Sequence, residues 1–201
     1  MARKILAPGT ILAPLPAVMV SCGTTEKANV LTIAWTGIIN TKPPMTYISV
    51  RPSRHSYDII KESGEFVINL TTSKLVHETD FCGVRSGRDT DKPAKCRLHL
   101  EEASAVSAPV IAESPLSLEC RVTEIKPLGT HDMFIAEIVA INVDERYIDS
   151  KGKINLQQAG LMAYSHGEYF SLGRKLGEFG YSVAKKAKNK SYNHSARNKR
   201  K

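Results

Sequence analysis

The densest group of potential anion-binding residues is the segment 50–56, which reads Val-Arg-Pro-Ser-Arg-His-Ser. It follows a predicted strand and precedes a predicted helix, so two guanidinium groups, two hydroxyl groups and the free N–H groups of a helix start come close together. Arginine can bind an oxyanion through two hydrogen bonds, and a helix N-terminus carries partial positive charge. The segment therefore suggests a phosphate site, to which Lys92 could add a further cation. A turn at Pro52, a helix cap at Ser53 and solvated arginines would explain the same residues.

Three other segments carry candidate functional side chains. Trp35, the only tryptophan, lies among small residues that would let a flat ligand approach the backbone, although a tryptophan in a strand is more often a core residue. His131 precedes Asp132, which could orient the imidazole for proton or hydride chemistry or could instead cap its own turn. The aromatic residues of 164–170 could stack on a planar cofactor or close a barrel.

Several catalytic motifs are absent from the sequence. There is no glycine-rich dinucleotide motif, no P-loop, no H-E-x-x-H and no G-x-S-x-G. The six histidines form no chelating pair and the four cysteines no C-x-x-C pair. We therefore expect no metal site, and free thiols in a reducing compartment.

Strands dominate the predicted secondary structure. Apolar and polar residues alternate clearly in 116–122 and less strictly in 65–70, which is typical of half-buried strands. The segment 133–143 is apolar on both faces and rich in β-branched residues, which favours a central strand covered on both sides over a buried helix. The remaining predicted strands are 16–22, 30–39 and 45–50.

The predicted helices are few and short. One covers 54–63, with Ser53 as its cap and Gly64 at its end. A second covers 73–81 and stops before the next glycine, and the polar segment 83–95 is predicted to be a functional loop. Most strands follow one another without a helix, which excludes a doubly wound parallel sheet. We expect an all-β dominated antiparallel barrel or sandwich with a few peripheral short helices.

The positive charge is unevenly distributed along the chain. The net charge is +8, yet 184–201 holds eight basic residues and no acidic one, which leaves 20 of each in 1–183. We predict one domain over 1–183 and a basic, disordered tail over 184–201. The neutral body argues against a nucleic-acid partner, except through the tail. No apolar run is long enough to span a membrane, and prolines interrupt the apolar N-terminal stretch, so we expect a cytoplasmic protein without a membrane partner.

Four blocks of the sequence, taken in order, resemble the flavin reductase-like, FMN-binding split-barrel family, and within it the flavoredoxin branch. They are residues 28–70, 80–92, 127–147 and 161–173. The resemblance implies an antiparallel Greek-key split barrel that forms a homodimer, with FMN at or near the subunit interface.

The resemblance also implies roles for individual residues. Those expected to bind the cofactor are Asn29, Thr32, Ala34, Trp35, Thr36, Arg51, Ser53, Arg54, Ser56, Cys82, Gly83, Ser86, Lys92 and Tyr169. The segment 32–36 would border the isoalloxazine ring, the serines and basic residues would hold the ribityl and phosphate groups, and Cys82 and Gly83 would close over the flavin. His131 is the one candidate catalytic residue, on the nicotinamide side, where this chain has Gly-Thr-His-Asp instead of the family's Gly-Asp-His.

The implied activity is that of an NAD(P)H-dependent flavin oxidoreductase. FMN would take a hydride from NADH or NADPH and pass electrons on, and the protein would supply orientation and electrostatics without an obligatory general acid or base. One alternative is a bound-FMN electron-transfer protein that a redox protein partner reduces. Another is an accessory polyanion-binding role of the basic tail.

Overall fold

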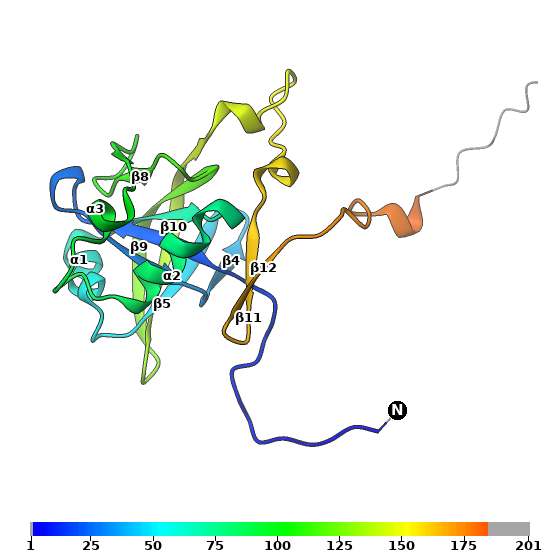
Figure 1. Cartoon of the computed structure of the whole chain (residues 1–201), viewed down its shortest axis with the longest axis horizontal. Coiled ribbons are helices and arrows are strands. Elements are labelled where there is room, and N and C mark those ends of the chain that lie inside the picture. The colour runs from blue at the N-terminus through cyan, green and yellow to red at the C-terminus, as the bar shows by residue number, and fades with distance from the viewer. Residues whose placement is uncertain (1, 185–201) are drawn as a thin grey trace, which may run out of the picture.

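The computed structural model describes residues 2–184 (Figure 1). The predicted basic tail therefore lies, apart from its first residue, outside the described residues. The body is built on a seven-stranded antiparallel sheet with the order β3-β2-β6-β9-β10-β5-β4. Its strands are β2 (Val18–Cys22), β3 (Asn29–Ile33), β4 (Thr36–Asn40), β5 (Met45–Val50), β6 (Glu65–Leu70), β9 (Leu116–Pro127) and β10 (Asp132–Val143).

Smaller elements surround this sheet. A three-stranded sheet has the order β1-β11-β12, and β7 pairs with β8. These strands are β1 (Leu15–Pro16), β7 (Leu100–Glu101), β8 (Val110–Ile111), β11 (Met162–Ser165) and β12 (Glu168–Ser171). The α-helices are α1 (His55–Ser63), α2 (Val76–Val84) and α3 (Lys92–Cys96), and the 3-10 helices are η1 (Thr25–Lys27), η2 (Ser73–Leu75), η3 (Glu145–Tyr147), η4 (Leu156–Ala159) and η5 (Tyr181–Val183). The predicted β-dominated antiparallel fold with short peripheral helices is confirmed.

The sheet curls because its two edges are joined by a very short connection. β3 and β4 lie at opposite ends of the strand order, yet only Ala34 and Trp35 separate them in the chain. The Ser49 N–H of β5 donates to the Trp35 carbonyl at 2.9 Å, which ties the connection to the far edge. The prediction of one strand over 30–39 was therefore wrong, because the chain leaves one edge of the sheet there and enters the other.

The other strands form where they were predicted, but the half-buried character expected for 65–70 and 116–122 was wrong. Asn69 and Glu119, on the faces expected to be wet, are fully buried, and both side chains are held by hydrogen bonds. β10 is a strand between β9 and β5, which excludes the helix alternative. Its expected burial on both faces was wrong: Phe134 and Ala136 are fully buried, whereas Ile141 is 56% exposed. The outer face at Ile141 is not covered by any other element in the described part of the chain.

Two helix boundaries differ from the prediction. Arg54, not Ser53, occupies the N-cap position of α1, and neither side chain makes a capping hydrogen bond. Gly64 ends α1 as predicted, with φ 68° and its N–H bonded to the Ile60 carbonyl. α2 continues through Gly83 to Val84. The glycine allows close packing and does not end the helix, since a Cβ there would lie 3.2 Å from the Thr32 Cβ.

The segment 83–95 is only partly a loop. α3 begins inside it at Lys92, where the Asp91 carboxylate accepts a hydrogen bond from the Ala94 N–H at 3.0 Å. Lys92, which the sequence suggested as a possible phosphate ligand, is only 2% exposed. Its burial was not predicted.

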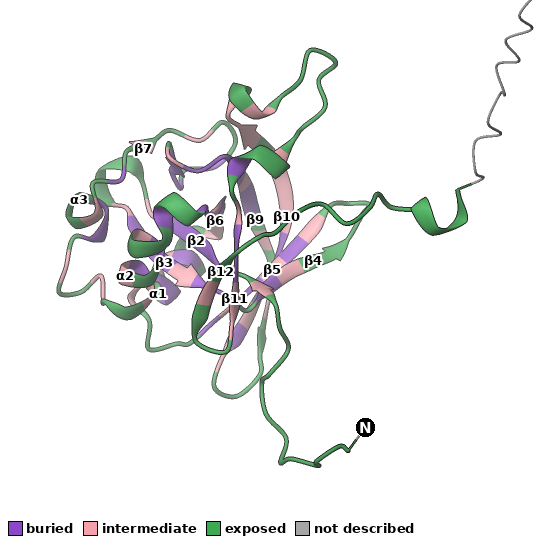
Figure 2. Ribbon diagram, turned by 45° about the vertical axis from the view of Figure 1, so that its right-hand side comes forward, coloured by how far each residue is buried: buried purple, intermediate pink, exposed green. Residues whose placement is uncertain are grey.

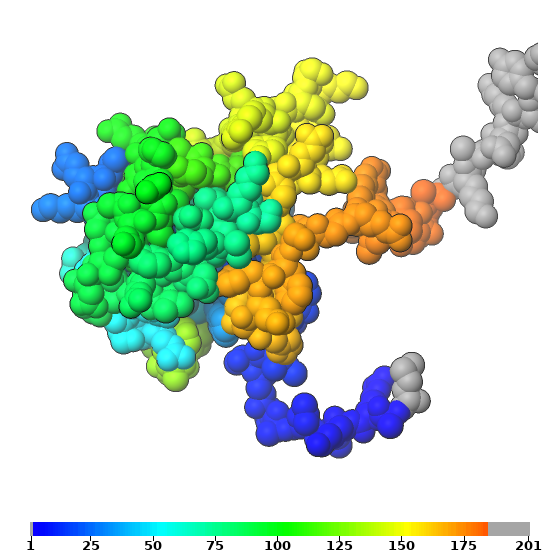
Figure 3. All heavy atoms as spheres, in the orientation of Figure 1, coloured from blue at the N-terminus to red at the C-terminus, as the bar shows by residue number. Residues whose placement is uncertain are grey.

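Two apolar clusters support the site. The main core lies within the curled sheet and under α1, where buried residues gather on the strands (Figure 2). The Tyr57 and Phe134 rings pack edge to face there, with centroids 5.3 Å apart. A second cluster lies beneath α2 and α3 and includes Met19, Val30 and Cys82. Residues 2–14 and 172–184 reach away from this body (Figure 3). Within residues 2–184, no helix has the length and apolar character needed to cross a membrane.

Candidate functional site

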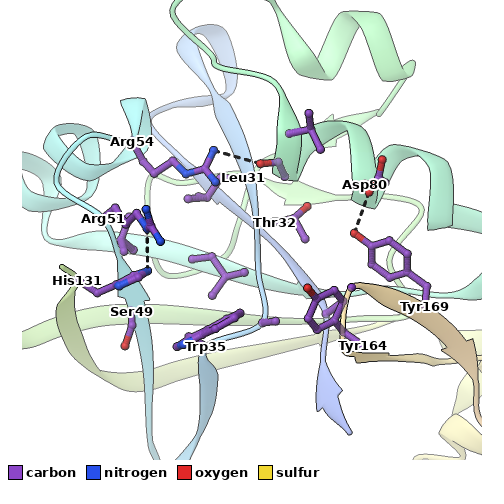
Figure 4. A pocket seen from close by; sticks show the side chains of 17 residues that line it. Leu31, Thr32, Trp35, Ser49, Arg51, Arg54, Asp80, His131, Tyr164 and Tyr169 are labelled. Carbon is purple, nitrogen blue, oxygen red and sulfur yellow. Dashed lines mark hydrogen bonds between the residues drawn. The ribbon is translucent and has the colours of Figure 1, made fainter. Parts of the chain in front are cut away.

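A cavity of about 520 Å³ lies where β3 passes into β4. Its walls come from this connection, the end of β5, α2, the turn before β10 and the β11–β12 hairpin. Figure 4 shows Arg51 and Arg54 on one side of the cavity and Tyr164 and Tyr169 on the other, with Thr32 between them. Ala34 contributes a small side chain, so a flat group can lie close to the backbone here. We call this space the ring cavity.

A second cavity, of about 310 Å³, adjoins the first and shares Leu31, Arg51, Arg54 and Val84 with it. Among the described residues, five basic side chains and no carboxylate line this space, which we call the phosphate cavity. The basic residues are Arg51, Arg54, Arg85, Arg88 and Lys92, and the hydroxyl groups are those of Ser53, Ser56 and Ser86.

The arginines of the phosphate cavity are held by neutral acceptors. Arg54 Nη1 donates to the Gly83 carbonyl at 3.1 Å, and Arg88 Nη1 donates to the Ser53 carbonyl at 2.8 Å. Arg51 Nε donates to His131 Nε2 at 3.4 Å. Within residues 2–184, none of the three forms an ion pair with a carboxylate, so their positive charge is left for a bound anion.

Lys92 lines the phosphate cavity although it is almost fully buried. Its Nζ donates to the Cys82 carbonyl at 3.2 Å, and burial lowers its pKa. Nearby, Asn29 Nδ2 donates to Ser56 Oγ at 2.5 Å, which holds the hydroxyl at the start of α1. The buried lysine and this amide both line the phosphate cavity.

One wall of the ring cavity consists of two parallel rings. The planes of Trp35 and His131 differ by only 4°, with ring centroids 6.4 Å apart. Burial, followed by the charges of Arg51 and Arg54, lowers the pKa of His131 from its ordinary 6.5. A neutral imidazole can accept the hydrogen bond from Arg51, which the imidazolium cannot.

We expect the NMR titration of the His131 ring to have its midpoint below pH 6.5, because protonation in the folded state is opposed by burial and by two guanidinium groups. The unfolded chain binds this proton more readily, so protonation of His131 lowers stability as the pH falls below 6.5. Replacing Arg51 with methionine should raise the midpoint, and Arg121→Met, at an exposed position of β9 outside both cavities, should leave it unchanged. An unchanged midpoint in Arg51→Met would contradict the assignment.

The opposite wall carries two tyrosines and an aspartate. Tyr169 Oη donates to Asp80 Oδ1 at 3.2 Å, and the Tyr164 and Tyr169 rings pack at 60°. Burial and the Asp80 charge raise the pKa of Tyr169 to about 12. The phenol therefore stays protonated at neutral pH and fastens the β11–β12 hairpin to α2.

A glycine permits the loop after α2 to close over the phosphate cavity. A Cβ at Gly87 would lie 2.2 Å from Asn29 Oδ1 and 2.8 Å from His55 Cδ2. Both neighbouring side chains help to form the cavity wall.

The Gly87→Ala substitution should force this loop away from Asn29 and His55. We expect about 1–3 kcal/mol lower free energy of unfolding, the range for overpacking, together with weaker ligand binding in the phosphate cavity. Denaturant titration measures the first effect. Gly173→Ala is the matched control, since a Cβ there meets no atom within 4 Å, and a Gly87→Ala protein as stable as this control would contradict the steric argument.

The structure brings most of the predicted site residues together. Those lining the ring cavity are Thr32, Ala34, Trp35, Arg51, Arg54, Gly83, His131 and Tyr169. Those lining the phosphate cavity are Asn29, Arg51, Ser53, Arg54, Ser56, Ser86 and Lys92. Their roles as ligands remain predictions.

Two predicted residues lie outside both cavities. Thr36 is buried and its Oγ1 donates to the Tyr47 carbonyl at 2.6 Å, so it holds β4 against β5. The Cys82 side chain is 1% exposed in the second core cluster. Burial raises its thiol pKa to about 12. Its carbonyl, not its thiol, serves the site by accepting from Lys92.

The sequence did not single out three lining residues, Asp80, Arg85 and Arg88. Both arginines lie in the polar segment 83–95, which was predicted to be a functional loop because such segments often carry function. The prediction did not name either arginine as a ligand. Asp80 had no local signal, since its pairing with Tyr169 depends on a residue 89 positions away. In residues 2–184 no group of three or more metal-binding side chains occurs.

Comparison with known proteins defines the class to which this site belongs. The family model of the Flavin reductase like domain matches residues 12–173, and the chain belongs to this family. Within the family it falls in the flavoredoxin branch. Flavoredoxin of Desulfovibrio vulgaris (Miyazaki F) is 26% identical with a TM-score of 0.83, and flavoredoxin from Methanosarcina acetivorans is 29% identical with a TM-score of 0.82. Each match covers 91% of this chain and 100% of the other.

A more distant structure bears on the fold alone. A Shewanella frigidimarina protein, described as having a split barrel domain, is 24% identical with a TM-score of 0.73. This match covers 82% of this chain and 85% of that one. The predicted split barrel is thus confirmed.

Proposed function

We propose that the two adjoining cavities bind FMN and that the protein is an NAD(P)H-dependent flavin oxidoreductase. The observation that carries this proposal is the pairing of two cavities. One lies along the β3–β4 connection and is lined by small and aromatic residues, and the other is lined by five basic residues and, within residues 2–184, by no carboxylate. A flavin mononucleotide has the same two parts, an aromatic ring system and a phosphate dianion. Membership of the flavin reductase-like family supports the same assignment.

The residues present fit the group. Arg51, Arg54 and Arg88 would bind the phosphate, since their guanidinium groups are fixed by neutral acceptors and retain their charge. Ala34 and Gly83 have small or absent side chains at the ring cavity, where a flat group needs close access to the backbone. Bound FMN would supply the redox chemistry, accepting a hydride from NADH or NADPH.

The side chains of the ring cavity would orient the reactants and exclude competing reactions. His131 is held neutral beside Arg51, so it positions the guanidinium group without adding a second positive charge. Tyr169 keeps its proton and locks the hairpin that closes the far side of the cavity. His131 remains our one candidate catalytic residue, through contact with the nicotinamide.

We also infer that the protein acts as a homodimer. Apolar side chains are exposed on the sheet and on both terminal segments: Ile38 is 70% exposed, Ile141 56%, Leu12 80% and Leu176 86%. Apolar side chains gathered into a large exposed patch mark a protein contact, and a second copy of the chain would cover these. Sedimentation of the full chain tests this inference, and a monomer at micromolar concentration would contradict it.

The activity is tested with the purified full-length protein. FMN titration should produce a bound-flavin spectrum, and the absence of binding at micromolar flavin would refute the proposal. Anaerobic stopped-flow mixing of the complex with NADH and with NADPH should bleach the flavin absorbance. A complex that binds FMN yet stays oxidised with both would instead be an electron carrier that a protein partner reduces.

A further inference from the structure

Two cysteine side chains that the proposed function does not use lie together beneath α2 and α3. Cys82 is in α2 and Cys96 is the last residue of α3, and the two helices pack against each other. Cys82 is a buried member of the second apolar cluster, and the half-buried Cys96 packs against that cluster. Both thiols are free in this structure.

The two thiols interact with each other. Burial raises the pKa of Cys82 to about 12, and repulsion between the two thiolates and a hydrogen bond with Cys96 add to this rise. Burial also raises the pKa of Cys96, which the hydrogen bond with Cys82 opposes. Side chains that share a hydrogen bond need only a small adjustment to reach the geometry of a disulfide.

A bond between these sulfur atoms would close a loop that carries much of the phosphate cavity. The residues that line this cavity and lie between positions 82 and 96 are Val84, Arg85, Ser86, Gly87, Arg88 and Lys92. In addition, the Cys82 carbonyl accepts a hydrogen bond from Lys92 Nζ at 3.2 Å. The cysteine pair therefore lies at the base of the segment that would hold an anion.

Two charged groups near the pair suit thiol chemistry. The positive charge of Lys92 favours the thiolate form of both cysteines. Glu78, one helical turn before Cys82 on α2, has a buried Oε2 that makes no hydrogen bond within the described residues. Its carboxylate can accept the proton that a thiol must lose before it attacks a disulfide.

We propose that Cys82 and Cys96 form a reversible disulfide that fixes the segment 83–95 around the phosphate cavity and so regulates ligand binding there. The regulatory part rests on the proposed function, because it takes the ligand of this cavity to be FMN. The oxidant is a small-molecule disulfide such as oxidised glutathione.

The exposure of the two thiols sets the order of the steps. Cys96 reacts first, because it is half-buried whereas Cys82 is 1% exposed. The Cys96 thiolate attacks one sulfur of the small-molecule disulfide, which breaks that S–S bond and releases one thiol. The Cys82 thiolate then attacks the Cys96 sulfur and releases the second thiol. The protein loses two protons and two electrons, and the small molecule gains both.

Oxidation should strengthen ligand binding. The two thiols already meet in this structure, so the bond retains the observed arrangement and removes looser ones. A segment that is ordered in advance costs less to fix when a ligand binds, and we expect about three- to tenfold tighter FMN binding after oxidation. The unfolded chain loses freedom as well, so the denaturant midpoint should rise.

The test compares the full chain after equilibration with oxidised and with reduced glutathione. Peptide mass spectrometry should find Cys82 linked to Cys96 after oxidation. FMN fluorescence titration and chemical denaturation of both forms measure the two effects. Cys96→Ser changes only the half-buried side chain and should abolish the cross-link and both effects. Cys120→Ala, at a buried thiol of the main core, is the matched control and should retain all three.

Several results would overturn the proposal. They are the absence of a cross-link under oxidised glutathione, a cross-link to Cys22 or Cys120 instead, and a Cys82–Cys96 cross-link that leaves FMN affinity unchanged. The same effects in Cys96→Ser as in the unsubstituted chain would also overturn it. If FMN binds neither form, the proposed function itself fails, while the mass spectrum and the denaturant midpoint still decide whether the disulfide forms and fixes the segment.

Discussion

Replacing Arg54 with methionine is expected to weaken FMN binding by about 10- to 100-fold. Arg54 lines both the ring and the phosphate cavity, and its Nη1 is fixed on the Gly83 carbonyl at 3.1 Å. A charge-assisted hydrogen bond to phosphate contributes about 1.5–3 kcal/mol, and each 1.4 kcal/mol corresponds to about tenfold in the dissociation constant. Methionine retains much of the apolar volume and removes the charge. Fluorescence titration with FMN measures the loss.

Riboflavin supplies the control for this experiment, because it has the same ring and no phosphate. Its affinity should fall much less than that of FMN in Arg54→Met. Arg121→Met is the matched protein control, since Arg121 is exposed and pairs with Glu65 at 3.5 Å, outside both cavities. Equal losses for FMN and riboflavin would show that Arg54 supports the fold of the site and does not bind phosphate.

The Phe134→Ala substitution should lower the free energy of unfolding by about 3–5 kcal/mol. Phe134 is fully buried on β10 and packs edge to face with Tyr57 at 5.3 Å. Truncation removes the buried phenyl ring and leaves a cavity between the curled sheet and α1. The expected loss of stability is therefore in the upper part of the range for core substitutions. Because Tyr57 Oη also donates to the Asp132 carboxylate beside His131, the site should loosen as well.

Chemical denaturation followed by tryptophan fluorescence measures this stability change. Phe170→Ala is the control, since Phe170 is 50% exposed on β12 and should cost much less. A Phe134→Ala protein within about 1 kcal/mol of the unsubstituted chain would mean that the surrounding core collapses into the space.

The sequence predicted the elements best where a local pattern has a local cause. Alternation of apolar and polar residues identified β6 and β9, because successive side chains of a strand point to opposite faces. Gly64 was recognised as the end of α1, because its left-handed conformation suits glycine. The segment 50–56 was identified as an anion site candidate from residue types alone, and most of its polar side chains line the phosphate cavity.

Predictions were wrong where a residue's role depends on a distant partner. Gly83 looked like the end of a helix, but it lies within α2, where Thr32 packs against it. Thr36 and Trp35 are neighbours in the chain, yet only Trp35 lines the ring cavity, because the chain changes sheet edge between β3 and β4. The burial of Lys92 follows from the packing of α3 against α2, which no local pattern shows.

The sequence by itself thus determined the class of fold, the types of side chain available for an anion and a flat ring, and the neutrality of the body apart from the tail. Only the tertiary structure decided which of those side chains meet, that the arginines face neutral acceptors, and that the ring cavity and the phosphate cavity adjoin. The physical reason is that strand and turn patterns arise from contacts between near neighbours. The cavities, in contrast, are enclosed by segments that lie far apart in the chain, between residues 17 and 169. These segments approach one another only after the sheet curls.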